Sequence, residues 1–440
     1  MKFSWNTISQ RWLLASLFIV LALAIADRWV DRLYDSIRMQ GDRKFYHWDA
    51  RTLWRFRPFL DVEGNGRRMR TNSMGFRGVE EYELASPHDL RIVTLGDSRA
   101  YGMVVDDDFT FSHVLQNQLR SSGIDAEVIN TGTPGYTIAQ ARGKLEQMLV
   151  YKPDIALLCV GYNDRRYLIL TPPDSEEMFA RTALMRNIAD ALQWSGLLYA
   201  AGYELGMRKL RNLQENPPSL EDIPVRVPAA AFRSEMEKLI LLCRRQGIRL
   251  ILMKLAQNPR VIETPDRAAH LYEAGRYREA IDLLERESAQ IDVAAAPYSY
   301  YVLGKCWKAL GREKEAERCF HDHRPIGSLH GEAILRRQDR YLQIIDESGE
   351  REGAPVFDAK KAIEQVNERL HHADLRAYLD YFEKEKFTLA DESESIPREN
   401  GRVVDLDNFY CARFVDECHY DKAGHILIGL GLADAIVGGG

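Results

Sequence analysis

Short apolar runs alternate along the chain with longer segments in which apolar residues recur at helical spacing. Apolar runs bounded by turn residues are typical of strands that are buried on both faces of a parallel sheet. Such runs predict strands over residues 91–95, 126–129, 154–160, 249–255 and 355–357. The helical spacing predicts helices over residues 109–122, 137–149, 230–245 and 423–437. Strands that alternate with helices of this length form βαβ units, so we expect an α/β fold with a three-layer, doubly wound parallel sheet.

Two segments interrupt the alternation and are predicted to be insertions. Residues 165–228 are polar and contain two Pro-Pro pairs, which predicts a lid or flanking helices. Residues 266–324 contain an internal repeat in which Gly-Arg is followed by Glu-Ala (GRYREA and GREKEA). The repeat pairs Gly275 with Gly311, Ala280 with Ala316, and Leu284 with Phe320. It resembles the tetratricopeptide repeat, and an ordinary pair of helical hairpins is the alternative.

The N-terminus is the one segment whose composition is not globular. Trp12–Ala26 is an uncharged apolar run, preceded by Lys2 and Arg11 and followed by charges that cancel. This asymmetry places the N-terminus in the cytoplasm, so we expect a signal anchor: a single-pass membrane protein whose remainder is extracytoplasmic, in the periplasm or at the cell surface. Ala24-Ile25-Ala26 also fits a cleavage site, so a cleaved signal peptide is the first alternative and a buried core helix the second.

Composition excludes several classes of protein. The 440 residues are 45% hydrophobic and 28% charged, which excludes intrinsic disorder and a multi-span membrane protein. The net charge of −6 provides no basic surface for nucleic acid, so we expect no nucleic-acid partner. The six cysteines include no Cys-x-x-Cys pair, which argues against a zinc site. Export would permit a Cys411–Cys418 or a Cys306–Cys319 disulfide, although Cys306 and Cys319 fit better as small core residues.

Four short polar signals carry the candidate chemistry. Three of them directly follow predicted strands, and the fourth lies before the last helix: Gly96-Asp97-Ser98, residues 130–135 (NTGTPG), residues 161–164 (GYND) and residues 416–419 (DECH). The carboxyl ends of parallel strands meet at one edge of a sheet, where open α/β proteins bind their ligands. A serine hydroxyl, backbone N–H groups at glycines, an asparagine amide and an acid three residues before a histidine are the groups that acyl transfer requires.

In this order the signals resemble those of the SGNH hydrolases, the GDSL esterase/lipase superfamily, which have a flavodoxin-like fold. The resemblance covers residues 90–165, 230–256 and 354–437 and leaves both insertions outside. It implies that Ser98 is the nucleophile, His419 the general base and Asp416 the partner of His419. It further implies an oxyanion hole made of the Ser98 N–H, the Gly135 N–H and the Asn163 amide.

Two of these assignments have rivals within the chain. Gly132 competes with Gly135 for the oxyanion hole, and His425 competes with His419, which is preferred for its acid-x-x-His spacing. Ser98 is followed by Arg99 and Tyr101, where relatives often have small or aromatic residues. These side chains are expected either to crowd the acyl pocket or to favour an anionic substrate.

The resemblance implies a serine esterase that hydrolyses an acyl ester through an acyl-enzyme and without metal or organic cofactor. The predicted membrane anchor indicates a substrate in the cell envelope, and an O-acetyl ester is expected. One alternative is an O-acyltransferase acting on an extracytoplasmic polysaccharide. Another is a non-catalytic scaffold that uses the helical repeats. A flavodoxin-type nucleotide binder finds little support, because no Gly-rich phosphate loop opens a helix.

The expected organisation has five parts. They are a signal anchor with a juxtamembrane helix (1–40), an extension packed on the catalytic domain (41–90), a first catalytic part (91–256), a helical insertion (257–353) and a second catalytic part (354–440). The expected partners are an ester substrate, which is a glycan or a lipid, the membrane at the N-terminal helix, and a protein at the helical repeats.

Overall fold

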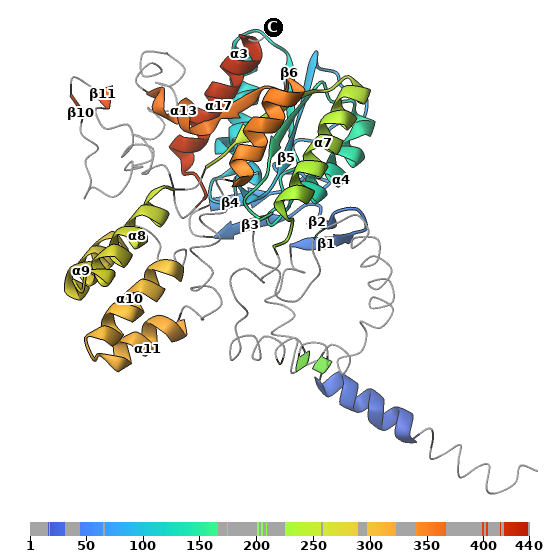
Figure 1. Cartoon of the computed structure of the whole chain (residues 1–440). Helices are drawn as coiled ribbons and strands as arrows, with labels where there is room; N and C mark the ends of the chain where they lie inside the picture. The colour runs from blue at the N-terminus through green and yellow to red at the C-terminus, as the bar shows by residue number, and fades with distance from the viewer. Residues whose placement is uncertain are drawn as a thin grey trace, which may run out of the picture.

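The structure is a computed structural model built around one parallel sheet with helices on both faces (Figure 1). It describes residues 18–30, 45–64, 67–165, 225–256, 258–288, 297–322, 340–366 and 418–438, and residues 16, 174, 200, 201, 204, 205, 208, 398, 399, 402, 403 and 414.

The five predicted strands form the sheet, each within one residue of its predicted ends. They are β5 (Leu90–Gly96), β6 (Ala126–Asn130), β7 (Ile155–Cys159), β8 (Arg249–Lys254) and β9 (Val356–Asp358). All four pairings are parallel, in the order β6-β5-β7-β8-β9. The chain therefore winds one way from β5 to β6 and the other way from β7 onward. This reversal creates a topological switch point at β5, the place where such sheets bind ligands.

Helices cover both faces of the sheet, which confirms the predicted three layers. One face carries α3 (Phe111–Ser121), α13 (Ala359–Glu364) and α17 (Lys422–Val437), and the other carries α4 (Ile138–Met148) and α7 (Ala229–Gln246). Successive side chains of a strand point to opposite faces, so Ile92 packs with the first group and Val93 with the second. Both residues are fully buried, as expected for strands that are apolar throughout.

The helix over 109–122 begins later than predicted for a local reason. Asp107–Phe109 forms a 3-10 turn, and α3 starts only at Phe111. Thr110 caps the helix, because its hydroxyl accepts the N–H of His113 at 3.3 Å.

The segment before the sheet forms two hairpins that pack on the α/β body. They are β1 (Tyr46–Asp49) with β2 (Leu53–Phe56), and β3 (Asp61–Gly64) with β4 (Arg67–Arg70). The first hairpin lies on α4, where Gln140 donates to the carbonyl of Thr52 at 2.7 Å. The second is fixed by Arg70, whose guanidinium lies 2.7 Å from the buried carboxylate of Asp107.

The internal repeat forms two helical hairpins with a core of their own. The helices are α8 (Arg260–Glu273), α9 (Tyr277–Ser288), α10 (Pro297–Ala309) and α11 (Glu313–Asp322). Gly275 and Gly311 each join the two helices of a hairpin, and both have φ of 73°. Ala280 and Ala316 are both buried, so the repeated positions have equivalent environments. The tetratricopeptide resemblance of this region stays a prediction.

The core of the repeat contains one of the two expected large side chains and two cysteines. Leu284 is buried in the repeat core, whereas the side chain of Phe320 lies outside the described residues. Cys306 and Cys319 belong to the same core and carry thiols. Cys418 also carries a thiol, so neither of the two possible disulfides forms.

The N-terminal apolar run contributes a helix over residues 18–30. Within the ranges given above, none of the helices combines the length and the apolar character needed to cross a bilayer.

The end of β5 is closed tightly against the end of β7. Gly96 lies opposite Cys159 in the parallel register and has φ of 142°. A Cβ atom at Gly96 would lie 2.0 Å from the carbonyl oxygen of Cys159. The turn after β5 therefore requires glycine for both conformation and space.

We predict that Gly96→Ala greatly destabilises the fold. Gly247→Ala is the matched control, because Gly247 also has a positive φ (70°) but nothing within 4 Å of its Cβ position. The control should cost about 1–2 kcal/mol for its left-handed conformation. Gly96→Ala should cost about 2 kcal/mol more, because the two backbones must separate. Urea unfolding followed by circular dichroism measures both, and equal losses would contradict the predicted steric role.

Candidate active site

Ser98 lies at the switch point, directly after the tight turn that ends β5. It is the first residue of the short helix α2 (Ser98–Tyr101) and is 7% exposed. Asp97 caps this helix, because its carboxylate accepts the N–H of Arg99 at 2.9 Å. The cap fixes the direction in which α2 leaves the sheet, and with it the position of the serine hydroxyl.

His419 meets Ser98 although the two are far apart in sequence. Its Nε2 lies 2.7 Å from Ser98 Oγ, a hydrogen-bonding distance. The flanking residues fix this position: Tyr420 donates to the carbonyl of Ala256 at 3.2 Å, and Asp421 caps α17 by accepting the N–H of Gly424 at 2.7 Å. Nδ1 of His419 lies 3.6 Å from the sulfur of Cys418.

Asp416, the predicted partner of His419, lies outside the described residues.

The loop after β6 distinguishes the two candidate oxyanion glycines. Gly132 donates its N–H to the side-chain oxygen of Asn130 at 3.0 Å. A Cβ atom at Gly132 would lie 2.4 Å from the backbone nitrogen of Tyr101, so this glycine serves the close packing of the loop on α2. Gly135 has φ of 81°, and its N–H has no hydrogen-bond partner among the residues that the structure describes. The geometry therefore favours Gly135 over Gly132 as a donor to a ligand.

Asn163 is joined to the same loop from the end of β7. Its side-chain nitrogen donates to the carbonyl of Tyr136 at 3.2 Å, and the amide retains a second N–H for a ligand. The loop is also tied to β5, because Thr133 donates its N–H to the carbonyl of Gly96 at 2.9 Å. These bonds connect the segments that carry Ser98, Gly135 and Asn163.

Asp164 organises these segments, a role that sequence reasoning missed although the residue belongs to the GYND signal. Its carboxyl group accepts two backbone N–H groups, from Gly161 and from Ile138, both at 2.8 Å. Its complete burial raises its pKa to about 7, although both N–H bonds act in the opposite direction. Asp164 therefore links the end of β7 to the first turn of α4.

Arg99 and Tyr101 do not occupy the positions that either expectation required. The Arg99 guanidinium is buried and pairs with Asp97 at 2.7 Å, so its charge is compensated inside the protein. Tyr101 is buried and stacks on Phe56, with ring centroids 4.5 Å apart. Their buried positions give no support to crowding of an acyl pocket or to selection of an anionic substrate.

His425 is part of the core rather than of the Ser98 site. Its Nδ1 accepts the N–H of Phe111 at 3.2 Å, and its ring stacks on that of Phe111. Burial lowers its pKa to about 3, with smaller contributions from Arg77 and His419. The imidazole is therefore neutral and fixed, and it holds α17 against the start of α3.

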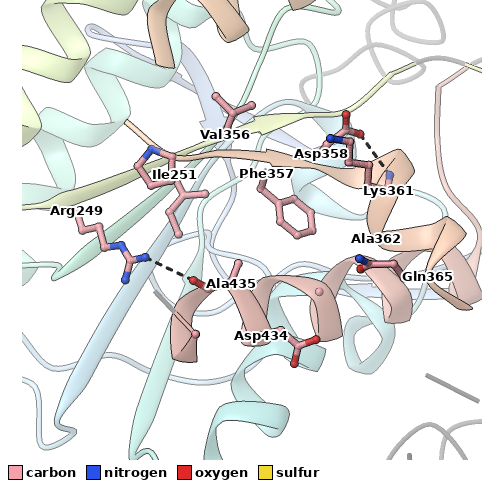
Figure 2. A pocket seen from close by; sticks show the side chains of 13 residues that line it. Arg249, Ile251, Val356, Phe357, Asp358, Lys361, Ala362, Gln365, Asp434 and Ala435 are labelled. Atoms are coloured by element: carbon pink, nitrogen blue, oxygen red, sulfur yellow. Dashed lines mark hydrogen bonds between the residues drawn. The ribbon is translucent and has the colours of Figure 1, made fainter. Parts of the chain in front are cut away.

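A pocket of about 660 Å³ lies at the edge of the sheet (Figure 2). Its walls come from β8, β9, α13 and α17, and its described lining includes no serine, cysteine or histidine. Arg249 extends from β8 to the carbonyl of Ala435 at 3.5 Å, near the C-terminus of α17, where a cation is favourable. The pocket thus lacks the groups for acyl transfer.

In the part of the chain that the structure describes, no three His, Cys, Asp or Glu residues gather to hold a metal ion.

Comparison with known proteins gives one match to a family. Residues 94–381 match the sequence model of the GDSL-like lipase/acylhydrolase family. This segment is well over half of the chain; it includes Ser98, Gly135 and Asn163 and ends before His419. No match was found among the curated proteins.

Three solved structures are among those to which the chain is similar. An acetyl xylan esterase, AlAXEase, is 12% identical, covers 79% of this chain and all (100%) of its own, and has a TM-score of 0.34. A catalytic mutant of Axe2, an acetylxylan esterase from Geobacillus stearothermophilus, is 11% identical with a TM-score of 0.34, over 78% of this chain and 93% of its own. A GDSL-like lipase from Bacteroides thetaiotaomicron is 9% identical with a TM-score of 0.33, over 79% of this chain and 88% of its own. Such overlaps are weak, and the assignment to a family rests on the sequence model.

The buried imidazole of His425 predicts a loss of stability in acid. Its pKa of about 3 in the folded state lies below the ordinary 6.5, so the unfolded chain binds the extra proton between these values. Its contribution to stability is complete above pH 6.5 and falls as the pH decreases toward 3. Between pH 7 and pH 5 the contribution of His425 alone should fall by about 2 kcal/mol, at ~1.4 kcal/mol per pH unit below 6.5.

Urea unfolding of the wild type and of His425→Asn at both pH values tests this prediction. The variant keeps a side-chain oxygen for the N–H of Phe111 but has no group that takes up the proton, so its stability should fall about 2 kcal/mol less than that of the wild type. The exposed His270, replaced by Asn, is the matched control and should follow the wild type. An equal loss in His425→Asn would assign the acid sensitivity to other groups.

Proposed function

Because the chain belongs to the GDSL-like lipase/acylhydrolase family, and is thus a hydrolase of ester bonds, we propose that it cleaves an acyl ester with Ser98 as nucleophile and His419 as general base. The observation that carries this proposal is the 2.7 Å between Ser98 Oγ and His419 Nε2. A hydroxyl is a weak nucleophile at neutral pH, and an imidazole at this distance can accept its proton as the new bond forms.

The reaction proceeds in two halves. Ser98 Oγ attacks the ester carbonyl while its proton passes to His419, and collapse of the tetrahedral intermediate returns that proton to the departing alcohol. A water molecule, deprotonated by His419, then attacks the acyl-enzyme, and the acid leaves as the Ser98 hydroxyl is restored. Asp416, three residues before His419, is the group proposed to hold the imidazole in the productive tautomer.

The negative oxygen of each intermediate is stabilised by three donors. They are the N–H of Ser98, the N–H of Gly135 and the second side-chain N–H of Asn163. This assignment is supported by the burial of Ser98 and Asn163 and by the hydrogen bonds that join their segments to the loop of Gly135. Each such donor contributes about 3–4 kcal/mol to transition-state stabilisation in comparable sites.

The proposed location is the cell envelope, with the chain anchored through the apolar run Trp12–Ala26, of which the described helix over residues 18–30 includes only the later part. Support comes from the exposed apolar side chains of that helix, such as Phe18 at 72% and Trp29 at 64%. A continuous exposed apolar surface is typical of a site that contacts a membrane or another protein, and a bilayer is the proposed partner here. The proposed substrate is an O-acyl ester of the envelope. An O-acetylated glycan is the first candidate and a lipid the second.

The paired helical hairpins α8–α11 are a proposed site for a protein partner.

Two substitutions test the catalytic pair. Ser98→Ala should reduce hydrolysis of p-nitrophenyl acetate to background, and His419→Asn should lower kcat at least about 100-fold, because general-base catalysis is lost. His425→Asn is the matched control and should retain most of the activity. Circular dichroism should show all three folded, and a fluorophosphonate probe should label every variant that retains Ser98 and His419. Turnover by Ser98→Ala would remove Ser98 from the mechanism, and an unlabelled wild type would favour the scaffold.

A series of p-nitrophenyl esters of increasing acyl length tests the proposed substrate class. An acetyl ester should be cleaved with the highest kcat/KM, and a preference for long chains would instead indicate a lipase. Product analysis in the presence of a polysaccharide separates the remaining alternative, since a hydrolase releases free acid whereas an acyltransferase yields acylated glycan.

A further inference from the structure

The direction of the Gly135 N–H is not fixed by its own residue. Gly135 lacks a side chain and has φ of 81°, so both adjoining peptide planes are free to rotate unless other groups hold them. An oxyanion donor is effective only when it is already aimed at the reacting oxygen. The groups that hold these two peptides therefore determine whether Gly135 can act as a donor.

The peptide that carries the Gly135 N–H is held by a tryptophan from the N-terminal extension. Trp54, on β2, donates its indole N–H to the carbonyl of Pro134 at 3.1 Å. In a planar trans peptide the C=O and the N–H point in opposite directions. Once the carbonyl of Pro134 is directed at the indole, the N–H of Gly135 must point away from it. The same hydrogen bond polarises the peptide and so strengthens the N–H as a donor.

The next peptide is held by an arginine of the 165–228 insertion. Arg226 donates from Nη1 to the carbonyl of Gly135 at 2.6 Å, and from Nη2 to the carboxylate of Asp174 at 2.7 Å. Its guanidinium also lies over the indole of Trp54, 5.9 Å from the ring centroid. Asp174 and Arg226 belong to opposite ends of the 165–228 insertion. The carbonyl of Pro134 thus accepts from an indole N–H, and the carbonyl of Gly135 accepts from a guanidinium.

The indole itself is in a fixed position. Trp54 accepts a hydrogen bond at its carbonyl from the hydroxyl of Tyr136, and its ring packs edge-on against that tyrosine. A Cβ atom at Gly143 of α4 would lie 3.0 Å from the carbonyl oxygen of Arg51, so the hairpin lies directly on the helix. The ring of Trp54 would lie 3.2 Å from a Cβ atom at Gly135, so a side chain at this position would press on the indole.

We propose that Trp54 is a positioning residue for the oxyanion donor Gly135, and that Arg226 fixes the second peptide of the same donor. This inference rests on the proposed function, because it assigns a role within the same site. It makes the hairpin β1–β2, which precedes the family-matched segment, a part of the catalytic unit.

Trp54→Phe is the decisive variant, because phenylalanine keeps an aromatic ring but has no N–H. A mispositioned oxyanion donor stabilises the transition state less and leaves the binding of the ground-state substrate unchanged. We expect kcat for p-nitrophenyl acetate to fall about tenfold while KM changes less than about twofold. The affinity for phenylboronic acid, which forms a tetrahedral adduct with the serine, should fall by the same factor as kcat. Trp307→Phe, the same substitution on α10 in the helical insertion, should change none of these values.

Arg226→Lys is the second variant and remains informative if Trp54→Phe is unstable. Lysine keeps a cation for Asp174 but cannot hold that carboxylate and the carbonyl of Gly135 with two separate nitrogens. We expect a smaller loss of kcat with the same pattern in KM and in boronate affinity.

If kcat is unchanged in both folded variants, or if only KM changes, the positioning role is wrong. The proposed esterase function would still stand in that case, because the wild type remains active. A wild type that neither hydrolyses esters nor reacts with a fluorophosphonate would overturn the proposed function itself, and the positioning role with it.

Discussion

Two neighbouring strands end in direct backbone contact at the centre of the sheet, and the geometry of the site depends on this contact. The N–H of Asp97 donates to the carbonyl of Cys159 at 3.3 Å across the turn that Gly96 makes possible. Because the strands are parallel and adjacent, the segments that follow them leave the sheet side by side. Ser98 lies two residues after the end of β5 and Asn163 four residues after the end of β7, so the pairing of these strands alone brings nucleophile and amide to the same place.

A buried ion pair then fixes the nucleophile's helix to the rest of this edge. Arg99 pairs with Asp97 and also donates to the carbonyls of Val160 at 3.3 Å and Leu255 at 2.7 Å. These carbonyls follow β7 and β8, so one guanidinium connects the ends of three strands. Removing either partner of such a pair would leave an uncompensated buried charge, which costs about 3–5 kcal/mol. The cation next to Ser98 is therefore compensated within the protein and adds no net positive charge to the substrate side.

The sequence predicts the parts of this protein that depend on local patterns. Strand positions follow from apolar runs such as 249–255, whose burial requires no knowledge of the partner. The approach of Ser98 and His419 was expected from the order of the signals and is found at hydrogen-bonding distance. The family resemblance preferred Gly135 to Gly132, but the residues themselves do not distinguish the two, because two glycines in one loop differ only in where their N–H groups point.

Contacts between distant segments were beyond such reasoning. The position of Arg99 depends on carbonyls 61 and 156 residues away, and a short motif does not reveal that these carbonyls converge. The bonds from Trp54 and Arg226 to the loop of Gly135 span 80 and 91 residues. A bond between neutral groups, such as the one from Trp54, adds about 0.5–1.5 kcal/mol to folding, and a bond from a charged group, such as Arg226, adds about 1.5–3 kcal/mol. Their effect on a reaction can be larger, because an oxyanion donor acts only when aimed correctly. Contacts from an extension and an insertion that lie outside the sheet can therefore determine how well the site stabilises a transition state.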